Sequence, residues 1–108
     1  MHQVTFIAPI TLASGVSEKE LLAASDRFQT GFVDHQPGVL RRELVKKSEG
    51  RYVDIVLFRS IEDANDVMAR EQESKLCAEF FALMDMSDAA TQEMGPYVSL
   101  AVYERKPR

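Results

Sequence analysis

The chain has 108 residues, of which 45% are hydrophobic, and its formal net charge at pH 7 is −4. This length and composition fit one domain, residues 1–108, with a core of ordinary size. The acidic balance argues against binding to nucleic acids or to anionic membranes, because both attract basic patches. Cys77 is the single cysteine, so no disulfide framework is possible within one chain.

The first residues, MHQVTFIAPITL, show no basic region followed by a long apolar stretch, and a secretory signal is therefore not expected. No apolar run approaches the length that spans a bilayer. Together with the lone thiol, these features predict a protein of the reducing cytoplasm.

The first expected element is a strand over residues 3–12, which alternate in polarity with a period of two. Pro9 lacks an N–H group, so this strand is expected to be an edge strand or to be irregular there. A helix should then begin at the capping box Ser17-Glu-Lys-Glu20. Its apolar residues recur at helical spacing to about Gln36, and Pro37-Gly38 ends it.

Residues 39–48 and 52–59 predict two strands joined by a hairpin turn at Glu49-Gly50. The second of these strands carries large side chains on both faces, which indicates a central strand. Its two sets of alternating residues are Val53, Ile55 and Leu57 on one face, and Tyr52, Asp54, Val56 and Phe58 on the other.

A second capping signature, Ser60-Ile-Glu-Asp63, opens the next helix. Its apolar stripe is interrupted by a polar patch from Arg70 to Lys75, so two helical pieces with a bend are expected. Residues 85–96 are polar and predict a loop or a short extra helix. Residues 97–106 alternate again and predict the last strand.

The order β-α-β-β-α-β predicts an α+β, ferredoxin-like fold, whose antiparallel sheet is covered by helices on one face. The uncovered face is expected to be half apolar, a composition that suits packing against a second copy. A homodimer that closes into a dimeric α/β barrel would result. The residues expected there are Ile7, Val56, Phe58 and the tyrosines of the last strand, mixed with Thr5, Asp54 and Ser99.

The stretch from His35 to Ala64, together with the helical and strand patterns after it, resembles a known family. A helix ends in PGVL, a hairpin leads to a Phe-x-Ser, Ser-Ile-Glu-Asp-Ala opens a helix, and the last strand reads VSLAVYE. Over residues 4–104 this pattern is similar to the antibiotic biosynthesis monooxygenase-like family of dimeric α/β barrels. The resemblance implies a small homodimer with a pocket between the sheet and the second helical region.

Members of that family include cofactor-independent monooxygenases that oxidise anthrone- or quinol-type aromatics with molecular oxygen, as well as haem-degrading enzymes and isomerases. Family members often carry His-x-x-Phe in the second helical region, where this chain reads Cys77-Ala-Glu-Phe80. The haem-degrading type uses an Asn in the first strand, a Trp and a helical His. The anthrone-oxidising type is associated with a Trp and an Asn in its pocket. This chain has no Trp, and Asn65 is its only Asn, so neither set carries over.

Asp54 is the first candidate for a catalytic proton acceptor, because it lies among apolar neighbours on the central strand. Burial there would raise its pKa toward the working range of a general base. The structural alternative is an ion pair with Arg41, Arg51 or Arg105, or a partner on the same sheet face across the dimer.

His35 is the second candidate base, although a histidine near a helix C-terminus also suits a capping role. Tyr52 and Tyr103 are candidates for orienting a substrate through their hydroxyl groups, although tyrosines on a sheet face usually pack. His2 and His35 are the only histidines and stand near no second ligand at metal-binding spacing, so no metal site is expected.

Apolar residues of both helical regions are expected to form the core and to line a pocket against the sheet. They are Phe28, Phe32, Cys77, Phe80 and Phe81. Cys77 lies on the apolar helix face, which favours a buried small hydrophobe over a reactive thiol. No glycine-rich phosphate loop, Rossmann fingerprint or serine elbow is present, so no cofactor is expected.

The sequence therefore leaves two main functions open, and an isomerase or a lyase on the same scaffold is a third alternative. The first is a cofactor-independent monooxygenase acting on a small quinol- or anthrone-like aromatic compound. The second is a non-catalytic dimeric barrel that binds a small apolar ligand or serves as an assembly module. An ionisable group inside a closed, ligand-sized cavity would favour the first.

Overall fold

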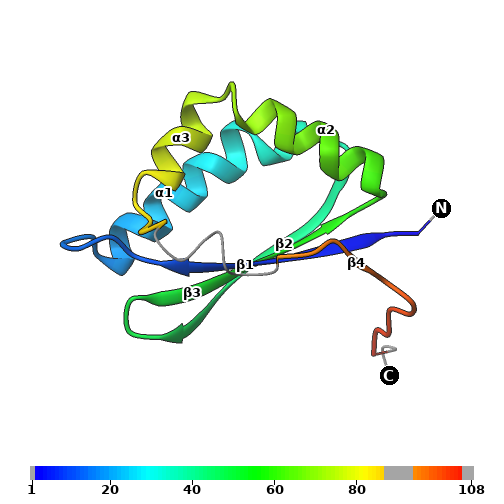
Figure 1. Ribbon diagram of the computed structural model, residues 1–108, viewed down its shortest axis with the longest axis horizontal. Coiled ribbons are helices and arrows are strands. Elements are labelled where there is room, and N and C mark those ends of the chain that lie inside the picture. The colour runs from blue at the N-terminus through cyan, green and yellow to red at the C-terminus, as the bar shows by residue number, and fades with distance from the viewer. Residues whose placement is uncertain (1, 87–93, 106–108) are drawn as a thin grey trace.

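The computed structural model describes residues 2–86 and 94–105. Its four strands form one sheet in the order β2-β3-β1-β4, and all neighbouring strands are antiparallel. The helices cover one face of this sheet (Figure 1). The structure confirms the α+β, ferredoxin-like fold. Its elements are β1 (Val4–Thr11), α1 (Glu18–Gly31), the 3₁₀ helix η1 (Val33–His35), β2 (Val39–Ser48), β3 (Arg51–Phe58), α2 (Ile61–Glu71), α3 (Lys75–Phe81) and β4 (Tyr97–Val98).

Each α-helix begins at a serine whose hydroxyl accepts a backbone N–H three residues on. The caps are Ser17, Ser60 and Ser74. The first two were expected from their capping boxes, and the break between α2 and α3 confirms the two helical pieces. α1 ends at Gly31 instead of continuing to Gln36, because the backbone tightens into the 3₁₀ turn η1, a common way for a helix to end.

The prediction for the two faces of the sheet is wrong for three residues. Asp54, Val56 and Phe58 were expected on the uncovered face, but they lie on the face that the helices cover, where Asp54 and Phe58 are buried. Alternation sorts a strand into two sets of side chains. It does not say which set meets the helices when both sets are apolar.

The uncovered face carries the other set of β3 and its neighbours in the register. Ile7 of β1 lies opposite Ile55 of β3, and Glu43 of β2 lies opposite Ile55 on the other side. Ile7 is exposed, and the β3 residues Val53, Ile55 and Leu57 are each partly exposed. This face is therefore apolar along β1 and β3 and charged along β2.

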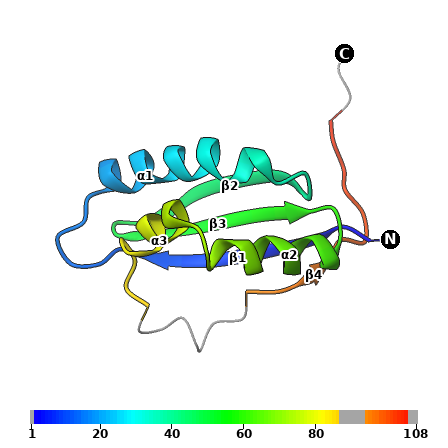
Figure 2. The same cartoon turned by 90° about the horizontal axis from the view of Figure 1, so that it is seen from above.

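The last strand is much shorter than expected. β4 contains only Tyr97 and Val98, which pair with Thr5 and Val4, and Ser99 adds one backbone bond to Gln3. Because β4 runs antiparallel to β1, residues 100–105 pass the N-terminal end of β1 and pair with no strand in the described part of the chain. Residues 100–105 leave the body of the protein in both views (Figures 1 and 2).

The short β4 also explains how Pro9 fits into β1. β4 pairs with β1 only at Val4 and Thr5, and Ile7 N donates to Met94 O. Pro9 lies beyond these contacts, so on that side it has no β4 partner that would need its missing N–H. Among the described residues, no strand pairs with β1 on that side at Pro9, so β1 is an edge strand there, as the proline predicts.

The core lies between the sheet and the helices. Its largest fully buried side chains are Leu21 of α1 and Cys77 and Phe80 of α3. α1 lies beside the α2–α3 pair above the sheet (Figure 2). Cys77 is a free, fully buried thiol, in agreement with its expected packing role.

Candidate functional site

A cavity of about 310 Å³ lies between the sheet and the helical layer. Aromatic rings from β1, α1 and α3 form much of its wall, namely Phe6, Phe28, Phe80 and Phe81. Four methionines also line it, namely Met68, Met84, Met86 and Met94. Methionine side chains are flexible and polarisable, so this wall can adjust to the shape of an aromatic ligand.

Backbone hydrogen bonds hold the segment after α3 against the end of β1. Ala13 N donates to Leu83 O, and Asp85 N donates to Thr11 O. Met84 pairs with Leu12 between these bonds. The sheet therefore positions Met84, Asp85 and Met86 at the cavity, although no regular element contains them.

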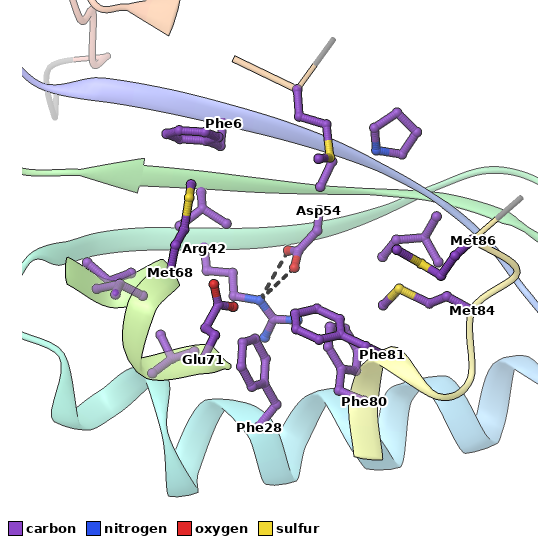
Figure 3. A pocket seen from close by; sticks show the side chains of 18 of the residues that line it. Phe6, Phe28, Arg42, Asp54, Met68, Glu71, Phe80, Phe81, Met84 and Met86 are labelled. Atoms are coloured by element: carbon purple, nitrogen blue, oxygen red, sulfur yellow. Dashed lines mark hydrogen bonds and ion pairs between the residues drawn. The ribbon is translucent and has the colours of Figure 1, made fainter. Parts of the chain in front are cut away.

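Arg42 and Asp54 form an ion pair in the floor of the cavity (Figure 3). Arg42 Nε lies 3.1 Å from each carboxylate oxygen of Asp54. Arg42 faces Val56 across the β2–β3 pair and Asp54 faces Leu44, so the two charges are diagonal neighbours on the helix side of the sheet. Their side chains are only 6% and 9% exposed.

α1 and α3 fix the Arg42 guanidinium from above. Its Nη2 donates to Ser25 Oγ over 2.8 Å, and its Nη1 donates to Gln29 Oε1 over 3.3 Å. The guanidinium carbon lies 4.9 Å from the ring centre of Phe28 and 5.3 Å from that of Phe80. Stacking on aromatic faces suits a guanidinium and helps it remain charged away from water.

Burial raises the pKa of Asp54 above its usual range, because the charged carboxylate loses water on the covered face of the sheet. The Arg42 guanidinium opposes this shift without cancelling it. Both oxygens of Asp54 are taken up by Arg42 Nε. Asp54 therefore stabilises Arg42 and is a poor acceptor for a ligand's proton.

Glu71 is a second carboxyl group in the cavity wall, contributed by the last residue of α2. Figure 3 shows its carboxylate beside the Arg42 side chain. The Glu71 carboxylate forms no hydrogen bond or ion pair with any residue in the described ranges, although the Glu71 backbone carbonyl accepts from Ser74 N. Burial, followed by repulsion from Asp54, raises the pKa of Glu71 to about 7, and Arg42 opposes the shift.

The structure places the four predicted catalytic residues apart. Only Asp54 lines the cavity. The Tyr52 hydroxyl donates to Glu18 Oε1 over 2.8 Å, in a cluster with Lys46 and Glu49 outside the cavity wall. His35 is exposed in η1, and Tyr103 is 91% exposed on the C-terminal segment.

Of the five residues expected to line a pocket, Phe28, Phe80 and Phe81 do so, whereas Phe32 and Cys77 are buried in the core beside it. The partner of Asp54 is Arg42 and not Arg41, Arg51 or Arg105. Arg41 lies on the other face of β2, where it pairs with Glu43. Once Asp54 is placed on the helix side, the period of two along β2 selects Arg42.

Sequence reasoning missed Arg42 and Glu71. Glu71 lies within the polar patch that was interpreted as a break between helices. A weak signal exists: Glu71 stands three and four residues after Met68 and Val67, so it continues the apolar stripe of α2.

Within residues 2–86 and 94–105 no cluster of three or more His, Cys, Asp or Glu side chains suited to a metal ion is found. No helix in these ranges is long and apolar enough to cross a membrane.

No protein-family profile matches the chain, and no curated protein matches its sequence. Solved structures do match. The cofactor-independent oxygenase SnoaB from Streptomyces nogalater is 21% identical, with a TM-score of 0.67 over 79% of this chain and 86% of its own. A protein from Caulobacter crescentus, proposed to be an antibiotic biosynthesis monooxygenase, is 16% identical, with a TM-score of 0.61 over 95% and 92%.

A nipsnap family protein of unknown function from Agrobacterium tumefaciens has the same architecture, with 18% identity, a TM-score of 0.56 and coverage of 78% and 80%. At these identities the likeness shows the fold alone. The chain has the fold of the antibiotic biosynthesis monooxygenases, as the resemblance implied. Fold does not decide the reaction, which has to be argued from the cavity.

Proposed function

We propose that this protein is a cofactor-independent oxygenase that oxidises a small, electron-rich aromatic compound of the quinol or anthrone type. The observation that carries the proposal is the cavity itself. It is ligand-sized and mostly apolar, and three ionisable side chains, Arg42, Asp54 and Glu71, meet inside it. SnoaB, which shares the fold, is a cofactor-independent oxygenase.

The chemistry asks little of the protein, because the substrate supplies the electrons. A phenol or anthrone that loses a proton becomes an electron-rich anion that reduces O₂. For an anthrone, the methylene carbon loses two hydrogens and gains one oxygen atom as a carbonyl, and the other oxygen atom leaves as water. The cavity must bind the ring, exclude bulk water and accept a proton.

Oxygen uptake by metal-free protein, measured with a panel of quinols, anthrones and flavonols, tests this function. We expect uptake above the autoxidation rate. Ala8, which lines the cavity, offers a blocking variant: Ala8→Leu places a larger side chain in the ligand's space and should abolish uptake. Leu22→Ala, on the exposed surface of α1, is the matched control and should behave like the unchanged protein.

Binding of the panel compounds without any oxygen uptake would contradict the oxygenase. It would instead favour the second function, a barrel that binds a small apolar ligand without catalysis. The apolar wall and the methionines support this alternative, because they suit binding whether or not a reaction occurs afterwards.

The assembly is part of the same proposal: two copies pack through the uncovered face of the sheet. Ile7, Val53, Ile55 and Leu57 form a patch there that only a second surface would remove from water. The C-terminal segment adds exposed apolar side chains, with Leu100 90% and Val102 60% exposed. A face-to-face homodimer would bury the sheet patch across a two-fold axis.

A further inference from the structure

Glu71 differs from every other carboxyl group that lines the cavity. Asp54 is bound at both oxygens by Arg42, and Asp85 is exposed at the end of the segment after α3. Glu71 is partly buried and lies next to the ion pair without joining it. Its carboxylate oxygens are therefore still available to a ligand in the cavity.

The ionisable groups that face Glu71 come from three elements. Arg42 on β2 attracts it, Asp54 on β3 repels it, and the Cys77 thiol on α3 is close enough to be influenced by it. The α1 side chains that meet this cluster, Ser25 and Gln29, are neutral. Because Arg42 and Asp54 compensate each other, the state of Glu71 sets the net charge of the cluster.

We propose that Glu71 accepts the proton of the hydroxyl group of a bound aromatic ligand, and that the cavity consequently selects neutral hydroxyl-bearing aromatics over those that carry a carboxylate. In this step the ligand's O–H bond breaks, an O–H bond forms on Glu71, and the ligand becomes an anion beside Arg42. The inference builds on the proposed function, for which it names the proton acceptor and the charge of the substrate.

The transfer leaves the net charge of the cavity unchanged, because one negative charge moves from Glu71 to the ligand. A carboxylate ligand would instead add a second negative charge to a poorly hydrated site that already contains ionised Glu71. Repulsion in such a site is far stronger than in water. With a pKa of about 7, Glu71 changes its protonation state near neutral pH, where a general base works best.

Glu71 also has a second neighbouring space. A second, more open hollow is lined by Met68, Glu71, Gln72, Ala78 and Phe81, so Glu71, Met68 and Phe81 belong to both walls. A proton taken up from the cavity side therefore has an exit through this hollow, between α2 and α3. The acceptor does not need to release it past the bound ligand.

The test is the pH dependence of ligand binding, measured without oxygen through the fluorescence of the ligand. The probes are 1-naphthol, 1-methoxynaphthalene, which has no proton to give, and 1-naphthoate. From about pH 5.5 to 8.5, 1-naphthol should bind roughly tenfold more tightly, since a hydrogen bond to a carboxylate is stronger than one to a neutral acid. The methoxy compound should show no such gain, and 1-naphthoate should bind more weakly as the pH rises.

Glu71→Gln should abolish the pH dependence for 1-naphthol and 1-naphthoate alike. Glu73→Gln, which removes the same charge from an exposed position outside the cavity wall, should leave both intact. A pH dependence that persists in Glu71→Gln, or its absence from the unchanged protein, overturns the assignment. The binding test contains no oxygen and is therefore independent of the oxygen-uptake test. If the protein showed this binding pattern but no oxygen uptake, the oxygenase function would be refuted and the role of Glu71 would stand.

Discussion

Arg42 and Asp54 are joined across neighbouring strands by a two-point ion pair, with Arg42 Nε 3.1 Å from both carboxylate oxygens. Two helices complete the arrangement, since α1 supplies two acceptors for the guanidinium and the rings of Phe28 and Phe80 stack on it. The pair links the sheet to the helical layer at the floor of the cavity. The role of the pair in the fold is therefore structural, because it holds the two layers together.

Breaking this pair from one side should destabilise the protein strongly. Arg42→Met leaves Asp54 buried without its counter-charge, and we expect a loss of about 3 kcal/mol in the free energy of unfolding, measured in urea. The double variant Arg42→Met/Asp54→Leu removes both charges and should recover most of that loss. Equal instability of the single and double variants would contradict this account.

The single variant should also respond to pH. Without Arg42, nothing on the floor opposes the effect of burial, so the pKa of Asp54 rises further above its unfolded value. A carboxyl whose folded pKa is raised stabilises the fold least when it is ionised. The deficit of Arg42→Met should therefore be small near pH 3 and grow as the pH rises, and a deficit independent of pH would refute the explanation.

Glu71 should make the fold less stable at neutral than at acidic pH. Its pKa rises from the ordinary 4.5 to about 7 on folding, so between these values the folded state retains a proton that the unfolded state has lost. Stability from this group is complete below pH 4.5 and falls as the pH rises through 7. Glu71→Gln should match the unchanged protein near pH 4 and exceed it by roughly 1 kcal/mol near pH 8, after allowance for solvent screening.

The matched control for that comparison is again Glu73→Gln. It is exposed, and its replacement should shift the unfolding curve by no more than a few tenths of a kcal/mol at either pH. If the two glutamine variants gave the same profile, the effect would belong to the net charge of the chain and not to the cavity.

The hydroxyl group of Tyr52 should have a structural role and not a catalytic one. Its side chain is 4% exposed, and its hydroxyl donates to Glu18, which Lys46 also contacts. Tyr52→Phe should cost about 1 kcal/mol in unfolding free energy, the usual worth of one hydrogen bond. Affinity for 1-naphthol should not change, and a large loss of affinity would make Tyr52 a site residue after all.

The uncovered sheet face predicts a dimer that one charge can disrupt. Leu57 lies on that face next to Thr5 in the register, and Leu57→Lys would place an ammonium group in the interface. We expect sedimentation at micromolar concentration to show a dimer for the unchanged protein and a monomer for this variant. Leu22→Lys, on the outer surface of α1, should stay dimeric, and a monomeric unchanged protein would refute the assembly.

Much of this fold arises from short-range patterns. Ser17 and Ser60 begin helices because a hydroxyl can satisfy a free backbone N–H, and this depends on residues only three apart. Gly50 has a positive φ of 75° at the turn between β2 and β3, as the acidic-glycine pair indicates. These signals lie within a few residues of the structure that they produce, so the element order could be predicted.

Long-range packing decided the rest. Both faces of β3 are apolar, so only docking of α1 and α3 decides that Asp54 turns toward the helices and meets Arg42 instead of Arg41. The last strand ends at Val98 because β1 runs out beside it, whatever the alternation in the residues after it. Glu71 is a site residue because the position of α2 in the tertiary structure places it beside a buried ion pair. Burial and neighbouring charge set the chemistry of an ionisable group, and both depend on residues distant in the sequence.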